Sequence, residues 1–438
     1  MPTPNNRTRI LWNALLAIVL ILAGAEFVVR GPVRFVRAAS FNDFISPYIQ
    51  TRAWMHGDDP YRPQNLVRLW PPEAERYDFL SRDLADGSLV LKRGIPTAYP
   101  LTAFVLIAPV AALPWHIAQP LWLVITVLSF LVTAASVLSL AKFPPGTYRT
   151  LTFLVTALAL APFHTALAAG SIVTVAVAAS SAATWAASRR HEILAALLLA
   201  IAVCLKPQIG LPFCFFYLVR RRWRMAPVAA GAVLLVFILG VSRSAASGTP
   251  WVENYLSDNR ILFAPGSLGD FTEGNPIRFG LINFQVAAYA LLHNREAANL
   301  TAIALAVAAA LVWLFFQRRN HSTDLLCLSA LAVLSLLPIY HRFYDASLLI
   351  FPLAWSLAAL NGPLRAMARS VFFIIIFVFL VPGGTALQQL QQTGHFADVR
   401  SYWWWNTLVL PHESWGILIL ALLLLGAMQI EAGSIETP

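Results

Sequence analysis

Residues 10–29 read ILWNALLAIVLILAGAEFVV, and two arginines, Arg7 and Arg9, stand just before this run. The hydrocarbon core of a bilayer is about 30 Å thick and takes roughly 20 apolar residues as a helix, so the run predicts a transmembrane helix. A signal peptide would have a shorter apolar stretch and a small-residue cleavage site close behind it. Here the run leads directly into Arg30, so we expect a retained first helix whose N-terminus is cytoplasmic.

Apolar runs of similar character recur from residue 10 to residue 430. The 438-residue chain is 58% hydrophobic and only 12% charged, with a mean hydropathy of +0.66. Soluble domains contain about 25% charged residues, so half of that value indicates a polytopic membrane protein. Because no long hydrophilic block interrupts the runs, we expect residues 1–438 to form a single integral membrane domain. This excludes a soluble enzyme with one membrane anchor.

The net charge of +10 raises the question of a nucleic-acid partner. The cations, however, lie in short clusters between apolar runs, at Arg189-Arg190, Arg220 to Arg224 and Arg318-Arg319. This distribution follows the positive-inside rule, so it indicates cytoplasmic loops and no nucleic acid. The three cysteines lie in apolar runs without ligand spacing, which predicts buried thiols with neither a disulfide nor a metal site.

With the basic clusters in the cytoplasm, the sequence predicts an all-α membrane bundle of about 12 transmembrane helices. Two shorter apolar stretches, 97–114 and 282–292, are expected to be partial or interfacial elements. The long segments 30–98, 242–280 and 383–412 become loops on the outer face. After the first helix, the expected spans are 117–141, 149–165, 171–188, 192–205, 207–219, 225–241, 297–317, 324–339, 344–360, 368–382 and 413–430.

The first outer loop contains FNDFISPYIQTRAWMHGDDPY at residues 41–61. Ser46 before Pro47 reads as the N-cap and first position of a helix, and Gly57 as the residue just past its end. The helix mixes aromatic, apolar and basic side chains, a composition typical of the membrane interface. Asp43 is therefore expected in a turn at the outer membrane surface, between the first spanning helix and an interfacial one.

Ionisable residues at membrane depth are costly, so each is a candidate for function. Lys206 lies in CLKPQIG, where Pro207 lacks an N–H and disfavours helix at the residue before it. A helix broken at a lysine brings free carbonyls and a cation to one place, which the threading puts on the outer side with Asp43. The alternative is a lysine at a helix end that extends its charge to the membrane surface.

A second polar cluster lies in PIYHRFYDASLLIFP, at residues 338–352. It contains His341, Arg342, Tyr344 and Asp345 at another outer boundary between two expected spans. Cation, imidazole and phenol near a membrane surface suit a lipid-linked phosphate. An ordinary interfacial loop with its aromatic belt is the alternative. The adjacent pair Asp58-Asp59 reads first as a turn with its glycine and proline neighbours, and a divalent-metal site stays open as the alternative.

These motifs occur in the order seen in glycosyltransferase family 87, and the chain resembles that family from about residue 40 to residue 360. The family belongs to the multi-spanning GT-C class and includes polyprenyl-phosphate-mannose-dependent mannosyltransferases of the bacterial envelope. The motifs are Asp43 with RAWMHGDDPY (52–61), AYPLTAFVLIAPVAALP (98–114), LKPQ (205–208), RRRWR (220–224) and HRFYD (341–345). Three elements depart from the family pattern, at Leu101, at Gly170-Ser171 and at Asn275-Pro276-Ile277.

We expect the site to use no cofactor and to hold no metal. Asp43 matches the catalytic aspartate of the first outer loop, where it would act as the general base. Residues expected at the phosphate of the donor are Lys206, His341 and Arg342. Residues expected to contact sugar or acceptor are Tyr99, Asn275, Tyr344 and Asp345.

The implied activity is an inverting transfer of a hexose, with mannose as the expected sugar, from a polyprenyl-phosphate donor. The acceptor would be an envelope glycan or glycolipid, and the protein a multi-pass component of the bacterial inner membrane with its site facing outside. Two other classes stay open on the sequence. Broken helices are typical of transporters and lipid flippases, and a polymerase or ligase acting on lipid-linked oligosaccharides would need similar surfaces.

Overall fold

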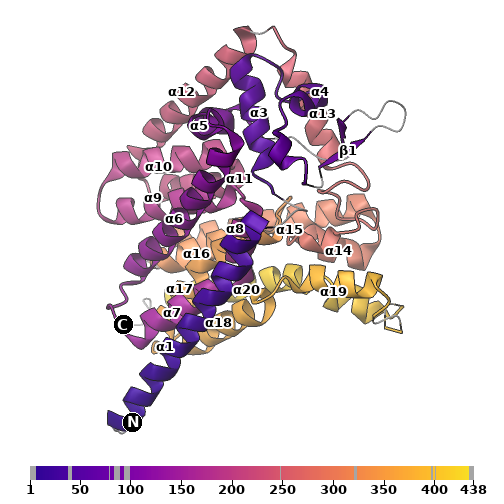
Figure 1. Ribbon diagram of the computed structural model, residues 1–438. Helices are drawn as coiled ribbons and strands as arrows, with labels where there is room; N and C mark the ends of the chain where they lie inside the picture. The colour runs from indigo at the N-terminus through magenta and orange to yellow at the C-terminus, as the bar shows by residue number, and fades with distance from the viewer. Residues whose placement is uncertain are drawn as a thin grey trace.

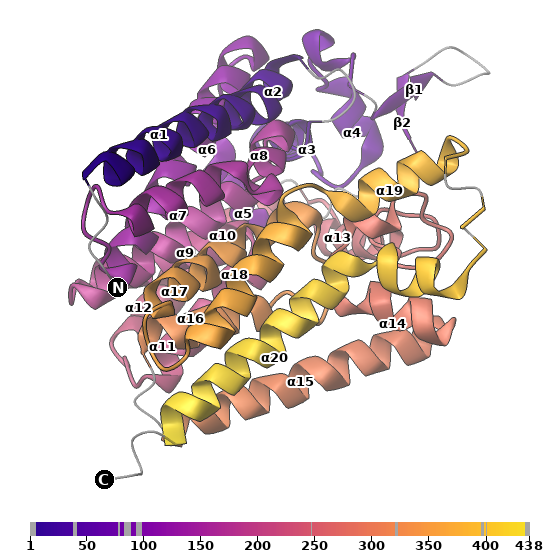
Figure 2. The ribbon, with the colours of Figure 1, turned by 90° about the horizontal axis from the view of Figure 1, so that it is seen from below.

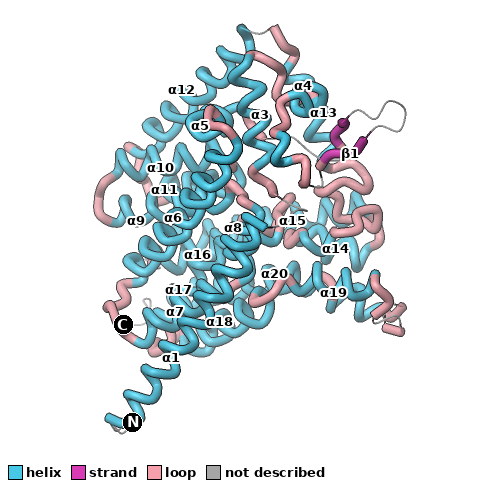
Figure 3. The backbone as a smooth tube through the Cα atoms, viewed as in Figure 1, coloured by secondary structure: helices cyan, strands magenta, loops and turns pink. Residues whose placement is uncertain are grey.

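The computed structural model describes residues 6–37, 42–77, 79–82, 89–92, 99–246, 248–319, 323–395, 398–399 and 401–433. Figures 1 and 3 show that these residues are mostly helical, with one small hairpin at the edge of the molecule. The helices pack side by side into a bundle, and the longest of them run roughly along its length. An all-α membrane architecture is therefore confirmed.

Six helical segments in the described residues are long and apolar enough to cross a membrane. A seventh span arises if α7 (Tyr148–Ala159) and α8 (Ala161–Ala169), which meet at a bend of 46°, are counted as one. The chain is thus a multi-pass membrane protein. The six segments contain α1 (Asn6–Val28) with η1 (Val29–Val33) and α2 (Arg34–Arg37), α6 (Trp115–Ala141), α12 (Met225–Ala246), α15 (Arg295–Arg319), α18 (Arg365–Phe379) with α19 (Gly383–Gln392), and α20 (His412–Gly433).

The expected number of about 12 spans is not confirmed. Five of the expected spans, together with the stretch 97–114 that was expected as a partial element, correspond to apolar helices of only 10–17 residues. At 1.5 Å per residue such helices are roughly 15 to 26 Å long, which is less than the thickness of a hydrocarbon core. The short helices are α5 (Leu101–Ala111), α9 (Val173–Ser188), α10 (Glu192–Leu205), α11 (Pro207–Val219), α16 (Asp324–Leu334) and the pair η4 (Phe343–Leu349) and α17 (Ile350–Ala359).

The predicted break at Lys206 is confirmed, because α10 ends before it and α11 begins after it. Lys206 has an extended backbone (φ −150°, ψ 92°), as expected for the residue before a proline. A Cβ on Gly210 would lie 2.5 Å from the backbone nitrogen of Val203, so only glycine allows α11 to pack this closely against α10. The carbonyl of Cys204, near the break, accepts a hydrogen bond from the Thr102 hydroxyl at 2.8 Å.

The helix expected around residues 46–56 is present as α3 (Ile45–His56), but its start differs from the prediction. Gly57 ends it in the left-handed conformation, with φ of 81°, as predicted. Ser46 is not the N-cap, because the helix begins at Ile45, two residues before the expected first position at Pro47, and Phe44 is the N-cap. The side chain of Asn42 accepts the Phe44 N–H at 3.0 Å and shapes the turn that Ser46 was expected to make.

Three segments expected as outer loops carry structure of their own, including a β-hairpin that the sequence analysis did not predict. Asn254 in the second segment donates a hydrogen bond to the Asp59 carboxylate in the first, at 2.6 Å. Gln392 in the third donates to the carbonyl of Pro276 in the second, at 3.1 Å. The three segments therefore meet at one end of the bundle (Figure 2). They contain α4 (Pro63–Arg68), η2 (Pro72–Ala74), β1 (Leu80–Arg82) paired antiparallel with β2 (Leu89–Leu91), α13 (Trp251–Leu262), η3 (Arg278–Gly280) and η5 (Trp405–Val409), with α14 (Phe284–Leu292) following the second.

Candidate functional site

The backbone of Asp43 is fixed against the end of α8. Its N–H donates to the carbonyl of Ala169 at 2.7 Å. The next residue, Phe44, stacks on the indole of Trp122 with ring centroids 4.4 Å apart and planes at 8°. The same indole donates to the carbonyl of Gly170 at 2.8 Å. The Asp43 turn is thus held against α6 and α8.

Gly170 is required where α8 ends beside this turn. It has φ of +64°, a conformation that side chains with a Cβ rarely adopt. A Cβ there would lie 2.4 Å from the ring of Phe35 and 3.2 Å from the Cβ of Phe44. Glycine therefore allows the Asp43 turn to approach α8.

Asp345 is the centre of a buried polar cluster at the start of η4. One carboxylate oxygen accepts a hydrogen bond from Lys206 Nζ at 2.6 Å. The other accepts from the backbone N–H of Arg342 at 3.0 Å and lies 3.1 Å from Nδ1 of His341. The side chain of Asp345 is fully buried and that of Lys206 is 12% exposed. The charge of Lys206 is therefore matched by a carboxylate of the protein itself.

A cavity of about 350 Å³ lies between the Asp43 turn, the break at Lys206 and the Arg342 segment. This volume is at the low end of the range for small-ligand sites, roughly 300–1,000 Å³. The cavity is lined by Asp43, Ser46, Phe79, Tyr99, Pro100, Ser171, Ile172, Leu205, Lys206, Pro207, Gln208, Tyr255, Asn259, Leu262, Phe263, Leu268, Ile339, Tyr340, Arg342 and Tyr344. Carboxylate, guanidinium, ammonium and four phenols thus face one small volume, and this section of the molecule is the candidate active site.

The carboxyl group of Asp43 titrates in an unusual environment. Burial raises its pKa above 3.8, and the charge of Arg342 and a hydrogen bond from Tyr344 oppose that rise. Its Oδ2 atom is buried and has no hydrogen-bond partner among the described residues. A buried carboxylate oxygen without a partner can accept a proton or a hydrogen bond from a bound hydroxyl.

Phenols and a guanidinium complete the polar wall. Burial raises the pKa of Tyr99, and it raises that of Tyr340, where the nearby Arg342 opposes it. Both groups therefore stay protonated and can donate hydrogen bonds. The Arg342 guanidinium lies 5.9 Å from the centroid of the Tyr344 ring, and the Lys206 ammonium 5.4 Å from the same centroid. The ring of Tyr344 thus lies close to two cations.

Five of the eight residues singled out from the sequence line this cavity, namely Asp43, Tyr99, Lys206, Arg342 and Tyr344. Asp345 lies directly behind Lys206, and His341 lies behind Asp345. His341 is 1% exposed, its Nδ1 lies 3.1 Å from the Asp345 carboxylate, and it is not among the residues that line the cavity. Asp43 and Lys206 were expected on the same side, and they are indeed brought together.

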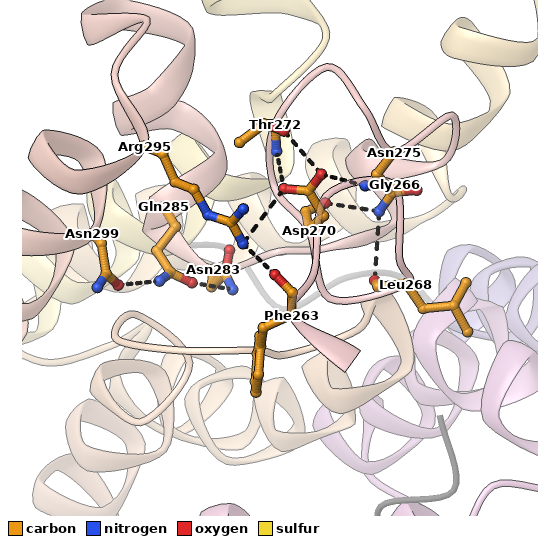
Figure 4. A network of polar contacts seen from close by, with 10 residues as sticks. All are labelled: Phe263, Gly266, Leu268, Asp270, Thr272, Asn275, Asn283, Gln285, Arg295 and Asn299. Carbon is orange, nitrogen blue, oxygen red and sulfur yellow. Dashed lines mark hydrogen bonds and ion pairs between the residues drawn. The ribbon is translucent and has the colours of Figure 1, made fainter. Parts of the chain in front are cut away.

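Asn275 lies elsewhere, in the loop between α13 and η3 (Figure 4). Its side-chain amide donates to the carbonyl of Asp270 at 2.8 Å, and its side-chain oxygen accepts from the N–H of Ile277 at 3.0 Å. Asp270 in turn accepts from Gly266 and Thr272 and lies 4.0 Å from the Arg295 guanidinium. Asn275 therefore shapes the loop that carries Phe263 and Leu268 to the cavity, and does not line the cavity itself.

Several lining residues were missed by sequence reasoning. Gln208 and Tyr340 lie inside motifs that were quoted for other residues, so their proximity to Lys206 and Arg342 was the available signal. Tyr255 and Asn259 are four residues apart on α13, the spacing of one helical face. The local sequence of α13 does not indicate which part of the protein this helical face contacts.

Comparison with known proteins gives one family match. A family model for glycosyltransferase family 87 matches residues 97–338, which is more than half of the 438 residues. The matched segment contains Tyr99, Lys206 and α13, whereas Asp43 and the 341–345 cluster lie outside it. No curated protein matches the chain.

Proposed function

The chain belongs to glycosyltransferase family 87 and is a membrane glycosyltransferase, and from that premise we propose that it transfers a hexose from a polyprenyl-phosphate donor to an envelope glycan or glycolipid. Mannose is the sugar we propose. The observation that carries the proposal is the presence of the Asp43 carboxylate and the Arg342 guanidinium in the lining of one cavity of about 350 Å³. Glycosyl transfer needs this pair of charges, a base at the acceptor and a cation at the leaving group.

In the proposed reaction the acceptor hydroxyl attacks the anomeric carbon of the donor sugar. The new C–O bond forms as the bond from the anomeric carbon to the phosphate oxygen breaks, and that electron pair leaves with the polyprenyl phosphate. The proton of the hydroxyl passes to Asp43, whose Oδ2 has no hydrogen-bond partner among the described residues. General-base catalysis of this kind contributes roughly 10²–10⁴-fold. A single displacement inverts the anomeric configuration.

The phosphate gains negative charge as it leaves, and a fixed cation stabilises that charge most where water is excluded. Arg342 is the cation proposed for this role, because its guanidinium lines the cavity with Asp43. The charge of Lys206 is matched by Asp345 at 2.6 Å. His341 and Asp345 hold the ammonium of Lys206 in place. Lys206 then acts as a hydrogen-bond donor in a fixed position, and the Lys206–Asp345 pair carries a net charge near zero.

The proposed substrates fit the surroundings of the cavity. Phenols and amides on its wall, such as Tyr99, Gln208 and Asn259, can bind the hydroxyls of a sugar. Apolar side chains, such as Ile339 and Leu262, can contact the first isoprenoid units of a carrier whose tail stays in lipid. We propose the bacterial inner membrane as the location, with the cavity facing outside.

The decisive test is transfer by the Asp43→Asn variant with radiolabelled polyprenyl-phosphate mannose. Asparagine keeps the size and the hydrogen bonding of the side chain but cannot take the proton, so transfer should fall about 10²-fold or more. Donor binding should change little. The matched control is Asp58→Asn, since Asp58 lies in the same segment but is paired with Arg68 and does not line the cavity. Normal turnover in Asp43→Asn would remove Asp43 from the mechanism.

A transporter or flippase is the second candidate, and the break between α10 and α11 favours it. Discontinuous helices of this kind form the substrate sites of many transporters. Reconstituted vesicles separate the two functions. Uptake of the labelled lipid-linked sugar without formation of a new glycosidic bond would support a transporter. Appearance of the labelled sugar in a glycosylated acceptor would support the enzyme.

A further inference from the structure

A second and larger cavity, of about 1370 Å³, lies at the opposite end of the bundle from Asp43. Helix α11 connects the two ends, because it begins directly after Lys206 and ends at Arg220. Its 13 residues correspond to roughly 20 Å of helix. We call this second space the basic cavity. It is separate from the site described above, and the family match gives it no role.

Basic residues from three helix ends converge on the basic cavity. Lys142 follows α6, Arg189 follows α9, and Arg220 to Arg222 follow α11. The lining contains these five cations and only two carboxylates, those of Asp324 and Glu431. The wall therefore carries an excess of positive charge.

Two of the five cations are committed to ion pairs. Arg220 pairs with Asp324 at 2.7 Å and Arg222 with Glu192 at 2.9 Å. In the part of the chain that the structure describes, no carboxylate lies within 4.0 Å of Lys142, Arg189 or Arg221. These three side chains are exposed at the cavity, so their charges are available to an anionic ligand.

The backbone at two of these residues gives a second observation. Lys142 has φ of 54° and Arg221 has φ of 57°. This is the left-handed conformation in which glycine is the usual residue at a helix end. The positive-inside rule asks only for cations near a membrane face. The rule does not explain why the cations lie on the wall of one cavity, at backbone positions where a residue with a side chain is disfavoured.

The remaining wall is apolar. Phe216, Leu328 and Trp355 line the basic cavity beside the cations, and all three are buried. A ligand that satisfies both parts of the wall carries an anionic group and a hydrocarbon chain. Basic pockets between helix ends at a membrane surface are a recurring site for anionic lipid head groups.

We propose that the basic cavity binds the phosphate of an anionic glycerophospholipid. The phosphate contacts Lys142, Arg189 and Arg221, and the upper part of an acyl chain packs on Trp355 and Leu328. Arg220 and Arg222, already paired, hold the shape of the wall. Bound lipid would connect the C-terminal ends of α6, α9 and α11.

The test is lipid binding by the full-length protein in detergent, followed by native mass spectrometry and by the thermal unfolding midpoint. Phosphatidylglycerol should bind and raise the midpoint, and phosphatidylcholine, which carries no net charge, should do so at least about tenfold more weakly. The triple variant Lys142→Gln, Arg189→Gln, Arg221→Gln should lose that preference. Transfer activity is a separate readout, because none of these residues lines the Asp43 cavity.

The matched control removes three cations near the same end of the bundle but outside the cavity, with Arg149→Gln, Arg365→Gln and Arg369→Gln. This control should keep the preference for phosphatidylglycerol. Equal losses in both triple variants would mean general attraction to a charged membrane surface and would overturn the proposal. Competition by millimolar inorganic phosphate as effective as that by the lipid would also overturn it, since the site would then bind a free anion.

Discussion

Replacing Lys206 by methionine is the perturbation whose size follows most directly from the structure. Lys206 Nζ lies 2.6 Å from the Asp345 carboxylate, and the two side chains are 12% and 0% exposed. Methionine keeps the apolar stem but leaves Asp345 without its cation. Removal of one partner from a buried pair costs about 3–5 kcal/mol, because the other charge stays buried and uncompensated. We expect Lys206→Met to lower the free energy of unfolding by that amount.

The assay is equilibrium unfolding in mixed micelles, for the two single variants and the double variant Lys206→Met, Asp345→Asn. The double variant removes both charges, so it should recover part of the loss, with a coupling of about 2–3 kcal/mol. Arg222→Met is the control, because the Arg222–Glu192 pair is similar in length at 2.9 Å but has exposures of 44% and 24%. An exposed pair of this kind contributes about 0–1 kcal/mol. A loss in Lys206→Met as small as that of the control would refute the buried-pair reasoning.

The same three variants show how Lys206 affects transfer. If Lys206 serves mainly to neutralise Asp345, transfer should recover in the double variant together with stability. If it contacts the donor phosphate directly, transfer should stay low by roughly 10–150-fold, the value of one charge-assisted contact of about 1.5–3 kcal/mol. Stability and activity measured on the same protein samples separate the two roles.

Three further predictions follow from the site and the topology. Burial raises the pKa of Asp43, and its protonated form cannot act as a base, so kcat/KM should fall as pH drops through a value above 3.8. Arg342→Gln should move this acid limb of the pH profile to higher pH, because it removes the positive charge that opposes the rise in the pKa of Asp43. An acid limb that does not move would contradict this electrostatic coupling. Gly170→Ala should lower stability by about 1–3 kcal/mol and reduce transfer, because the residue has a left-handed conformation and the added Cβ would meet Phe35 at 2.4 Å. The control is Gly146→Ala, which is also left-handed but has open space around it, so it should lower stability without affecting transfer. In a cysteine-free background, Glu75→Cys should react with an impermeant thiol reagent on intact cells and Pro145→Cys should not, and the reverse labelling would refute an outward-facing cavity.

The sequence predicted most helix positions because apolar runs and breakers are local signals. The span expected at 117–141 is α6 at Trp115–Ala141, and α10 and α11 have the bounds expected for 192–205 and 207–219. The break at Lys206 needed only the proline after it. The number of spans was less predictable, because an apolar run shows that a helix is buried but not whether lipid or protein surrounds it.

The candidate site was predictable in its residue types and not in its pairings. Lys206 and Asp345 are 139 positions apart, and no local pattern indicates that one neutralises the other. The position of His341 behind Asp345, away from the cavity, depends on the same long-range contact. Asn275 was chosen from a motif, whereas the structure uses it to build a loop around Asp270. The role of a polar residue thus depends on partners that only the fold brings together.

The length of α11 has a consequence for the kind of acceptor that the enzyme can use. Its 13 residues cover roughly 20 Å, about two thirds of the thickness of a hydrocarbon core. If its basic end reaches one membrane surface, the Lys206 end lies about 10 Å short of the other surface. Asp43 would then lie at the bottom of a recess and not on an open groove. A recess admits the end of a chain and excludes its middle, so we expect the enzyme to add single sugars to the termini of growing glycans and not to create branches within them.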